Sequence, residues 1–189
     1  MTEHPSHAAA APVPTRTGRR CGIVALGVAA AVLCADQLVK LWVVDNLALG
    51  QEYPVVPGLL WWEHIRNSGG AFSLGSGSTW FFTVVMAAVA VGILWLLRRV
   101  RDMWWALALG LVLGGTAGNL TDRLLREPGV GRGHVVDFIA VPHFAIFNLA
   151  DCGVVVGIGL VLLLILTERD LEARRAGSPE EDTVVDREH

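Results

Sequence analysis

Phe-Asn-Leu-Ala-Asp, residues 147–151, lies near the start of the last hydrophobic run of the chain, residues 145–166. That run is long enough to cross a lipid bilayer as a helix. Asn148 and Asp151 are three residues apart, so they share one face of such a helix. A carboxylate inside a membrane helix costs about 3 kcal/mol or more and is retained mainly where it faces a polar cavity. The other walls of that cavity must come from the rest of the chain.

The hydrophobic residues of the chain are gathered into runs rather than spread evenly. They make up 53% of the 189 residues and charged residues only 17%, which is more apolar than a typical soluble domain. Each run can span about 30 Å of hydrocarbon at about 1.5 Å per residue. The sequence predicts an all-α integral membrane domain, residues 19–167, between a disordered tail (1–18) and a charged tail (168–189). The four predicted transmembrane helices are residues 21–44, 80–97, 104–125 and 145–166.

Arginines gather at two places beside the predicted helices. One cluster lies within residues 16–20, before the first helix, and the other within 98–101, between the second and third helices. Positive residues next to membrane spans mark the cytoplasmic side, and a four-helix count places both clusters on one side. We therefore expect both termini to be cytoplasmic and loops 45–79 and 126–144 to be extracytoplasmic. The first run is too long for a signal-peptide core, so we interpret it as a transmembrane helix.

The two outer loops contain segments with strand propensity. Residues 59–65 are bulky and aromatic, and residues 134–141 are rich in β-branched and apolar side chains. The first loop also holds a turn-rich segment, Tyr-Pro-Val-Val-Pro-Gly at 53–58, and a glycine-rich bend, Asn-Ser-Gly-Gly-Ala-Phe-Ser at 67–73. Two short strands on one side of the membrane predict a small sheet on the membrane surface.

Polar residues recur at a common depth in three of the four predicted helices. Their spacings of three or four residues place them on one face of each helix, about 10 Å below the outer surface. The second helix contributes none. Structural ion pairs or hydrogen bonds between helices remain an alternative for each group taken alone. The residues are Asp36 and Lys40 in the first helix, Asn119, Asp122 and Arg123 in the third, and Asn148 and Asp151 in the fourth.

Asp137, in the outer loop before the fourth helix, adds a second carboxylate to that of Asp151. Two carboxylates close together do not both ionise readily, so one holds a proton and the pair titrates as a unit. Such a pair supplies a general base that activates water and a general acid that protonates a leaving amine. His134 and His143 flank the region, but their spacing matches no zinc motif, so we expect no metal.

Five segments, taken together and in order, resemble the motifs of bacterial lipoprotein signal peptidase, also called signal peptidase II. The resemblance covers about residues 36–151, and each motif by itself is weak. Gly70 stands where the family's Asn-x-Gly-Ala-Ala-Phe loop has an alanine, which concerns only local loop packing. The segments are Asp-Gln-Leu-Val-Lys (36–40), Asn-Ser-Gly-Gly-Ala-Phe (67–72), Gly-Asn-Leu-Thr-Asp-Arg (118–123), Val-Val-Asp-Phe-Ile (135–139) and Phe-Asn-Leu-Ala-Asp (147–151).

The resemblance implies an aspartic endopeptidase of the bacterial cytoplasmic membrane, with four transmembrane helices and an extracytoplasmic β-cradle. It would need neither metal nor other cofactor, bind no nucleic acid and act as a monomer. It would remove the signal peptide from diacylglyceryl-modified prolipoproteins just before the lipidated cysteine, with its active site facing outward, and would be inhibited by globomycin. Asp137 and Asp151 would form the catalytic dyad. The residues that would bind substrate or position the dyad are Asp36, Lys40, Asn67, Gly69, Asn119, Asp122, Arg123 and Asn148.

Two other functions are compatible with charged residues inside a membrane. The first is a small transporter or proton-conducting protein, in which Asp, Arg and Lys side chains form an ion path. The polar residues of this chain stop at one depth, however, and do not continue to the cytoplasmic side. The second is a structural membrane subunit whose polar groups only lock the helices together.

Overall fold

The computed structural model describes residues 16–69 and 79–172, and the expectations for the remaining residues of both tails and of the glycine-rich bend lie outside that range. All four described helices are long and apolar enough to cross a membrane, so the predicted fold class is confirmed. The helices are α1 (Arg16–Asn46), α2 (Thr79–Leu96), α3 (Met103–Leu125) and α4 (Leu149–Leu166), and the strands are β1 (Glu52–Val56), β2 (Leu60–Asn67) and β3 (Val135–Ala140).

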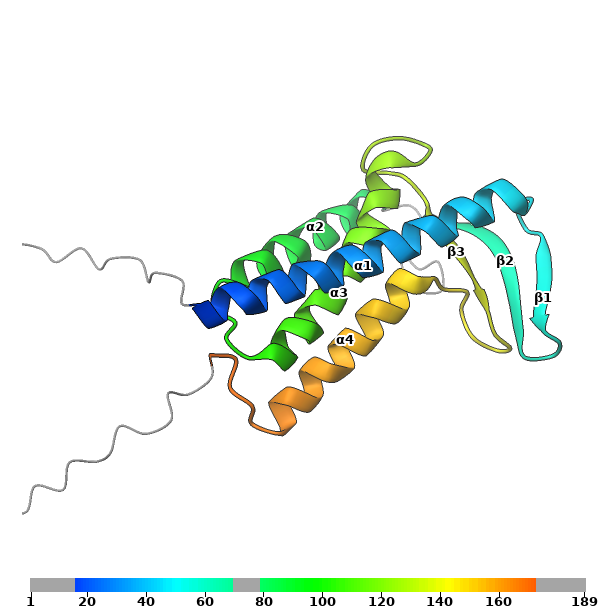
Figure 1. Ribbon diagram of the computed structural model, residues 1–189. Helices are drawn as coiled ribbons and strands as arrows, with labels where there is room; N and C mark the ends of the chain where they lie inside the picture. Colours follow the sequence, from blue (N-terminus) through cyan, green and yellow to red (C-terminus); the bar gives the residue numbers. More distant parts are fainter. Residues whose placement is uncertain (1–15, 70–78, 173–189) are drawn as a thin grey trace, which may run out of the picture.

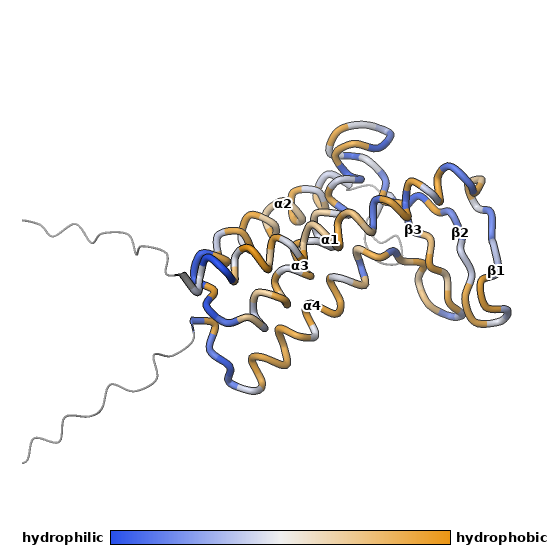
Figure 2. Tube along the Cα trace, in the orientation of Figure 1, coloured by the Kyte–Doolittle hydropathy of each residue, from blue (hydrophilic) through white to orange (hydrophobic). Residues whose placement is uncertain are grey.

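The helices form a bundle and the strands form a sheet beyond one end of it (Figure 1). The start of α1 and the end of α4 lie together at the opposite end. Figure 2 shows apolar residues along all four helices and hydrophilic residues concentrated at their ends and in the loops. This distribution is the one expected for helices surrounded by lipid.

Helix α3 is the centre of the bundle. Within its most apolar window 67% of the residues are buried, against 17% for α1, 17% for α2 and 22% for α4. Small residues allow this close packing. A side chain at Gly114 would collide with the backbone of Ala29 in α1, and one at Gly115 would collide with the backbone of Ala150 in α4. These glycines therefore bring the polar residues of α1, α3 and α4 within hydrogen-bonding reach of one another.

The sheet has three antiparallel strands in the order β1–β2–β3, one more than the two expected. The segment expected to be turn-rich is mostly strand β1, and the turn itself is at Pro57 and Gly58. Gly58 has φ +77°, and Leu59 N donates to Val56 O at 3.0 Å, as in a type II turn. On the other side of the sheet, β2 pairs with β3 so that Ile65 is opposite Asp137 and Asn67 is opposite Val135.

Helix α4 begins at Leu149, four residues later than expected. Asn148 caps it, and the preceding Phe147 pairs instead with Ile139 of β3 through an isolated bridge. Asp151 is therefore in the first turn of α4 and not about six residues inside it. A capping asparagine has extended backbone angles, so the helix cannot extend to earlier residues although they are apolar.

The chain after α4 folds back against the bundle at the end away from the sheet. Arg169 pairs with Asp102, Nη2 to Oδ2 at 2.8 Å, and its carbonyl accepts a 2.9 Å hydrogen bond from the indole of Trp105. Leu171 packs against the hydrophobic core. The sequence predicts only a charged tail over residues 168–172, because hydropathy alone gives no signal for contacts of this kind.

Candidate active site

Asp137 lies on β3 with its side chain turned toward the start of α4 and only 4% of its surface exposed. Its Oδ2 accepts a 2.9 Å hydrogen bond from Nδ2 of Asn67, and its Oδ1 accepts a 2.6 Å hydrogen bond from Nδ2 of Asn148. The pKa of Asp137 is raised to about 6, chiefly by burial and also by the nearby carboxylate of Asp151, while the two hydrogen bonds and Lys40 oppose the rise. Asp137 therefore changes charge within two pH units of neutrality.

Asp151 is the third residue of α4, where its carboxylate completes a capping box. Its Oδ2 accepts from the backbone N–H of Asn148 at 3.2 Å, and its own N–H donates to Oδ1 of Asn148 at 3.0 Å. Its Oδ1 accepts a 2.7 Å hydrogen bond from Nδ2 of Asn119 in α3. Both oxygens are thus held in place, one by the cap of α4 and the other by a side chain of α3.

Two asparagines connect the two carboxylates. Nδ2 of Asn148 donates to Asp137 and also, at 3.1 Å, to Oδ1 of Asn119. Asn119 in turn donates to Asp151. The chain of contacts Asp137–Asn148–Asn119–Asp151 orients each amide, because a carboxamide presents donors at one end and an acceptor at the other.

A buried ion cluster lies behind these asparagines. Nζ of Lys40 is 2.8 Å from Oδ2 of Asp36 and 2.8 Å from Oδ2 of Asp122, and all three side chains are fully buried. The same Nζ donates to Oδ1 of Asn119 at 2.9 Å. Asp36 and Lys40 therefore pair as their spacing predicts, but the structure adds a second carboxylate and a contact to the asparagine chain.

The cluster also fixes the backbones that carry the two aspartates. Oδ1 of Asp36 accepts from the N–H of Ala150, in the first turn of α4, at 2.9 Å. Oδ2 of Asp122 accepts from the N–H of Val136, beside Asp137 on β3, at 3.2 Å. Buried carboxylates are tolerated only when such partners satisfy them. The positions of both aspartates thus depend on contacts from α1 and α3.

Arg123 holds the loop that follows β2. Its guanidinium donates to the carbonyls of Asn67, at 3.2 Å, and of Gly69. It also donates to the carbonyl of Gly133 at 3.1 Å. Gly69 N–H binds Oδ1 of Asn67 at 2.9 Å, which turns the Nδ2 of that asparagine toward Asp137. Arg123 therefore supports Asp137 indirectly, through the backbone of the loop.

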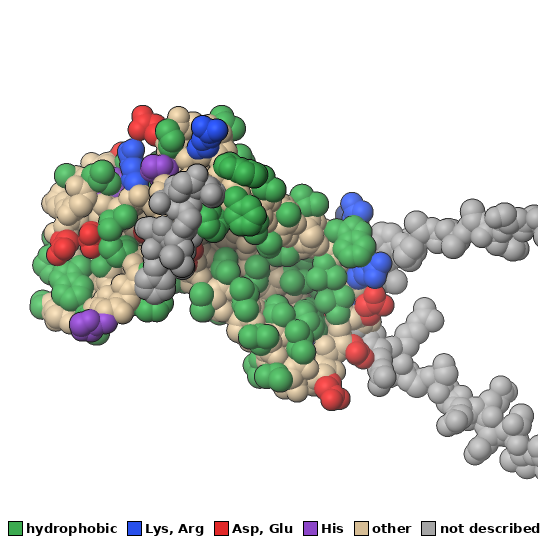
Figure 3. All heavy atoms as spheres, turned by 180° about the vertical axis from the view of Figure 1, so that it is seen from behind, with side chains coloured by type: hydrophobic (Ala, Val, Ile, Leu, Met, Phe, Trp, Pro, Cys, Tyr) green, Lys and Arg blue, Asp and Glu red, His purple; other side chains and the backbone are tan. Residues whose placement is uncertain are grey.

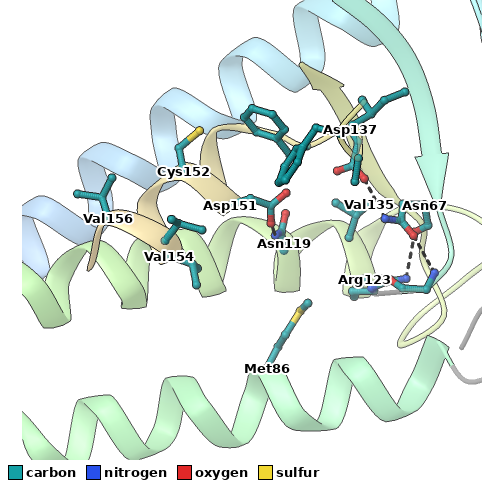
Figure 4. Close-up of a pocket in the computed structure, with 16 residues that line it drawn as sticks. Asn67, Met86, Asn119, Arg123, Val135, Asp137, Asp151, Cys152, Val154 and Val156 are labelled. Carbon is teal, nitrogen blue, oxygen red and sulfur yellow. Dashed lines mark hydrogen bonds between the residues drawn. The ribbon is translucent and has the colours of Figure 1, made fainter. Parts of the chain in front are cut away.

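The two aspartates line one cavity of about 550 Å³ (Figure 4). Its polar end is formed by the side chains just described, and its other walls are apolar. Met86 of α2 lies across the cavity from residues 154–156 of α4. Among the described residues, no group of three or more histidine, cysteine or acidic side chains is placed to hold a metal ion. The remaining lining residues are Asn67, Gly69, Asn119, Arg123, Val135, residues 144–147 and Cys152.

Several supporting residues were missed from the sequence. Gln37 donates to the carbonyl of Gly118 at 3.0 Å and to Asp122 at 3.3 Å. Helix α2 was expected to contribute no polar group, yet Thr79 donates to the carbonyl of Ser68 at 2.7 Å and Thr83 to that of Gly131 at 2.8 Å. Threonine often bonds within its own helix, so its presence in an apolar run carries no signal of such contacts.

Four helices long enough to span a membrane, around a cavity lined by two linked carboxylates, are the arrangement expected of a membrane aspartic peptidase. The chain belongs to the signal peptidase II family: residues 28–167 match the family model described as "Signal peptidase (SPase) II". The lipoprotein signal peptidase of Leifsonia xyli subsp. xyli is 47% identical over 165 residues, which are 86% of this chain and 76% of that one. The enzyme of the same name from Mycolicibacterium smegmatis is 44% identical over 169 residues, 89% of this chain and 72% of that one.

A solved structure agrees with the fold. The chain titled "Bacterial membrane enzyme structure by the in meso method at 2.3 A resolution" superposes with a TM-score of 0.70 at 25% sequence identity, covering 82% of this chain and 93% of that one. The protein is therefore a multi-pass membrane aspartic peptidase that removes signal peptides from prolipoproteins. This function confirms the peptidase interpretation over the transporter and structural-subunit alternatives.

Proposed function

We propose that Asp137 and Asp151 are the catalytic dyad of this peptidase. The observation that carries the proposal is that both carboxylates line one cavity and are linked through Asn148, which hydrogen-bonds both residues. One carboxylate takes a proton from water as the water attacks the scissile carbonyl carbon. The other, protonated carboxylic acid gives its proton to the departing amine nitrogen as the peptide bond breaks.

The other polar residues act in this proposal by positioning. Asn119 and Asn148 orient the carboxylates, and Asn67 holds Asp137 from the opposite side. Lys40, held in place by Asp36 and Asp122, brings a positive charge behind Asn119. Arg123 and Gly69 hold the loop that carries Asn67. Only the dyad exchanges protons with the substrate.

The shape of the cavity supports a lipid-modified substrate. Its polar end is at the start of α4, near the sheet, and its apolar walls continue along α2 and α4. A diacylglyceryl chain held in the outer leaflet can lie against those walls while the signal helix spans the membrane. The scissile bond, just before the lipidated cysteine, then reaches the depth of the two carboxylates. No cofactor and no nucleic acid take part in this scheme.

The charges of the loops support an orientation in the membrane. The arginines at 98–101 lie at the end of the bundle away from the sheet, which favours a cytoplasmic position for that end and for both termini. The active site then faces the outside of the bacterial cytoplasmic membrane. We propose that the monomer is the active unit and that the membrane domain of residues 19–167, extended by the docked segment 168–172, is sufficient for cleavage.

A cleavage assay tests the proposal. Purified protein should cut a diacylglyceryl-modified prolipoprotein just before the modified cysteine, and globomycin should block the reaction. The matched unmodified prolipoprotein should be cut at least about tenfold more slowly, since it lacks the acyl contacts. Asp137→Asn and Asp151→Asn should each bind substrate but not cleave it. Near-normal cleavage by either variant would exclude the dyad, whereas equal cleavage of the unmodified substrate would exclude only the lipid requirement.

A further inference from the structure

The loop between α3 and β3, residues 126–134, projects sideways from the bundle beside the start of α2, whereas the sheet extends beyond the end of the bundle (Figure 1). A hydrogen bond fixes the position of this loop along the axis of α2. Oγ1 of Thr83 donates to the carbonyl of Gly131 at 2.8 Å. Thr83 is four residues inside a membrane-spanning helix that begins at Thr79, which corresponds to a depth of about 6 Å along the helix axis. If α2 enters the bilayer where it begins, the tip of this loop is expected at the level of the lipid headgroups.

The tip of the loop presents an apolar side chain. Val130 is 84% exposed and stands between Gly129, with φ +152°, and Gly131, with φ +76°. These backbone angles favour glycine, and together they form a tight turn whose outermost side chain is Val130. Leu125, at the end of α3 where the loop begins, is 80% exposed. Both side chains are therefore turned away from the protein.

Arg132 is an exposed arginine of this loop, two residues after Val130. Arg66 pairs with Glu127 at 3.1 Å, and Arg126 pairs with Asp122 at 2.6 Å. Within residues 16–69 and 79–172, the guanidinium of Arg132 makes neither an ion pair nor a hydrogen bond. A guanidinium matches the geometry of a phosphate, and the long arginine side chain reaches headgroups from an apolar surface.

We propose that the loop at 126–134 is a phospholipid-binding element, in which Val130 enters the lipid and Arg132 binds the headgroup phosphate. Basic, acidic and apolar side chains lie together at this end of the molecule in Figure 3. The inference concerns a surface outside the active-site cavity and does not depend on the roles of the aspartates.

The loop is also connected to the active site. The N–H of Gly133 donates to the carbonyl of Arg123 at 3.0 Å, and its own carbonyl accepts from Nη1 of Arg123 at 3.1 Å. Arg123 holds the backbone carbonyls of Asn67 and Gly69. A lipid that fixes Arg132 therefore also restrains the neighbouring residue that supports Arg123. We expect phospholipid on this loop to increase the thermal stability of the active-site region.

A fluorescence experiment tests the insertion of Val130. In the Cys34→Ala/Cys152→Ala background, Val130→Cys is labelled with an environment-sensitive dye in phosphatidylglycerol/phosphatidylcholine nanodiscs. The control is Glu127→Cys, because Glu127 is in the same loop and its side chain is 85% exposed. The label at 130 should emit at shorter wavelength, resist aqueous iodide and be quenched by nitroxide-labelled lipid, whereas the label at 127 should be quenched by iodide. Equal iodide quenching at the two positions would refute the insertion.

The same label tests the phosphate contact. Phosphatidylglycerol is titrated into protein in neutral detergent, and the emission of the dye at 130 reports binding at the loop. Arg132→Gln should weaken the apparent affinity about fivefold, the effect of one basic side chain near an anionic lipid surface. Arg98→Gln, which removes an exposed arginine at the other end of the bundle, should leave the titration unchanged. An unchanged midpoint in Arg132→Gln, or the same response to inorganic phosphate alone, would overturn the proposal.

Discussion

Nδ2 of Asn148 lies 2.6 Å from Oδ1 of Asp137, so the residue that caps α4 also binds the carboxylate of β3. The backbone N–H of Asn148 reaches the second aspartate, Asp151, at 3.2 Å. One asparagine therefore ends the loop, starts the helix and sets the relative position of both carboxylates. The geometry of the site depends on where the helix begins.

Substitution of Asn148 separates its two roles. Asn148→Ser keeps an N-cap oxygen for the helix but is too short to reach Asp137. We expect a turnover number about 10- to 100-fold lower and some loss of thermal stability, since a hydrogen bond to a charged group contributes about 1.5–3 kcal/mol. Asn148→Ala should lose more stability, because it also removes the helix cap. The measurements are kcat, KM and Tm in the same detergent, and wild-type turnover in the serine variant would contradict this role.

The two aspartates should act as a unit. Asp137→Asn and Asp151→Asn each remove one partner of the proton exchange, so each should reduce turnover by orders of magnitude while substrate still binds. The double variant should be scarcely slower than either single variant, because effects of groups that act together are not additive. Single-turnover kinetics measure all three. Multiplicative losses in the double variant would mean that the two residues act independently.

The stability of the protein should depend on the ionisation of Asp137. Its pKa is raised from 3.8 to about 6 in the folded protein, first of all by burial, so the folded state binds the proton more tightly than the unfolded state does. The resulting stabilisation is fully present below about pH 4, is lost as the pH rises to about 6, and amounts to about 3 kcal/mol. The Asp137→Asn variant has no group that titrates at this position, so its stability does not contain this pH-dependent contribution.

The measurement for this titration is the difference in unfolding free energy between Asp137→Asn and wild type. The difference should shift in favour of the asparagine variant between pH 4 and pH 8. The new amide must also face one of the two amide donors now bound to Asp137, but that cost is the same at both pH values. A difference that does not change with pH would show that Asp137 is not perturbed by burial.

Arg123 should not be replaceable by lysine. Its guanidinium reaches the carbonyls of Asn67, Gly69 and Gly133 together, whereas an ammonium group is a point charge on a longer flexible stem. We expect Arg123→Lys to lower turnover at least about tenfold. Arg126→Lys is the matched control, because Arg126 binds Asp122 through Nε alone, and it should retain most activity. Equal activity of the two variants would remove Arg123 from the positioning scheme.

Local sequence patterns determine much of this protein. The four membrane spans follow from the length of each apolar run, and the spacings of Asp36 with Lys40 and of Asn119 with Asp122 and Arg123 place polar groups on single helix faces. These properties depend on residues within one or two helical turns, so they can be read from the chain alone. The same patterns marked Asp137 and Asp151 as a possible pair.

Tertiary structure decided the contacts that join these segments. Hydropathy could not place the start of α4. Asn148 sets that start inside an otherwise apolar run, through hydrogen bonds to Asp151 and to Asp137, a strand residue eleven positions earlier. Nor could spacing show that Lys40 meets Asp122 and Asn119 on another helix. Those contacts require α1 and α4 to pack closely on the glycines of α3. Such packing depends on residues far apart in the chain, and a local sequence pattern carries no information about it.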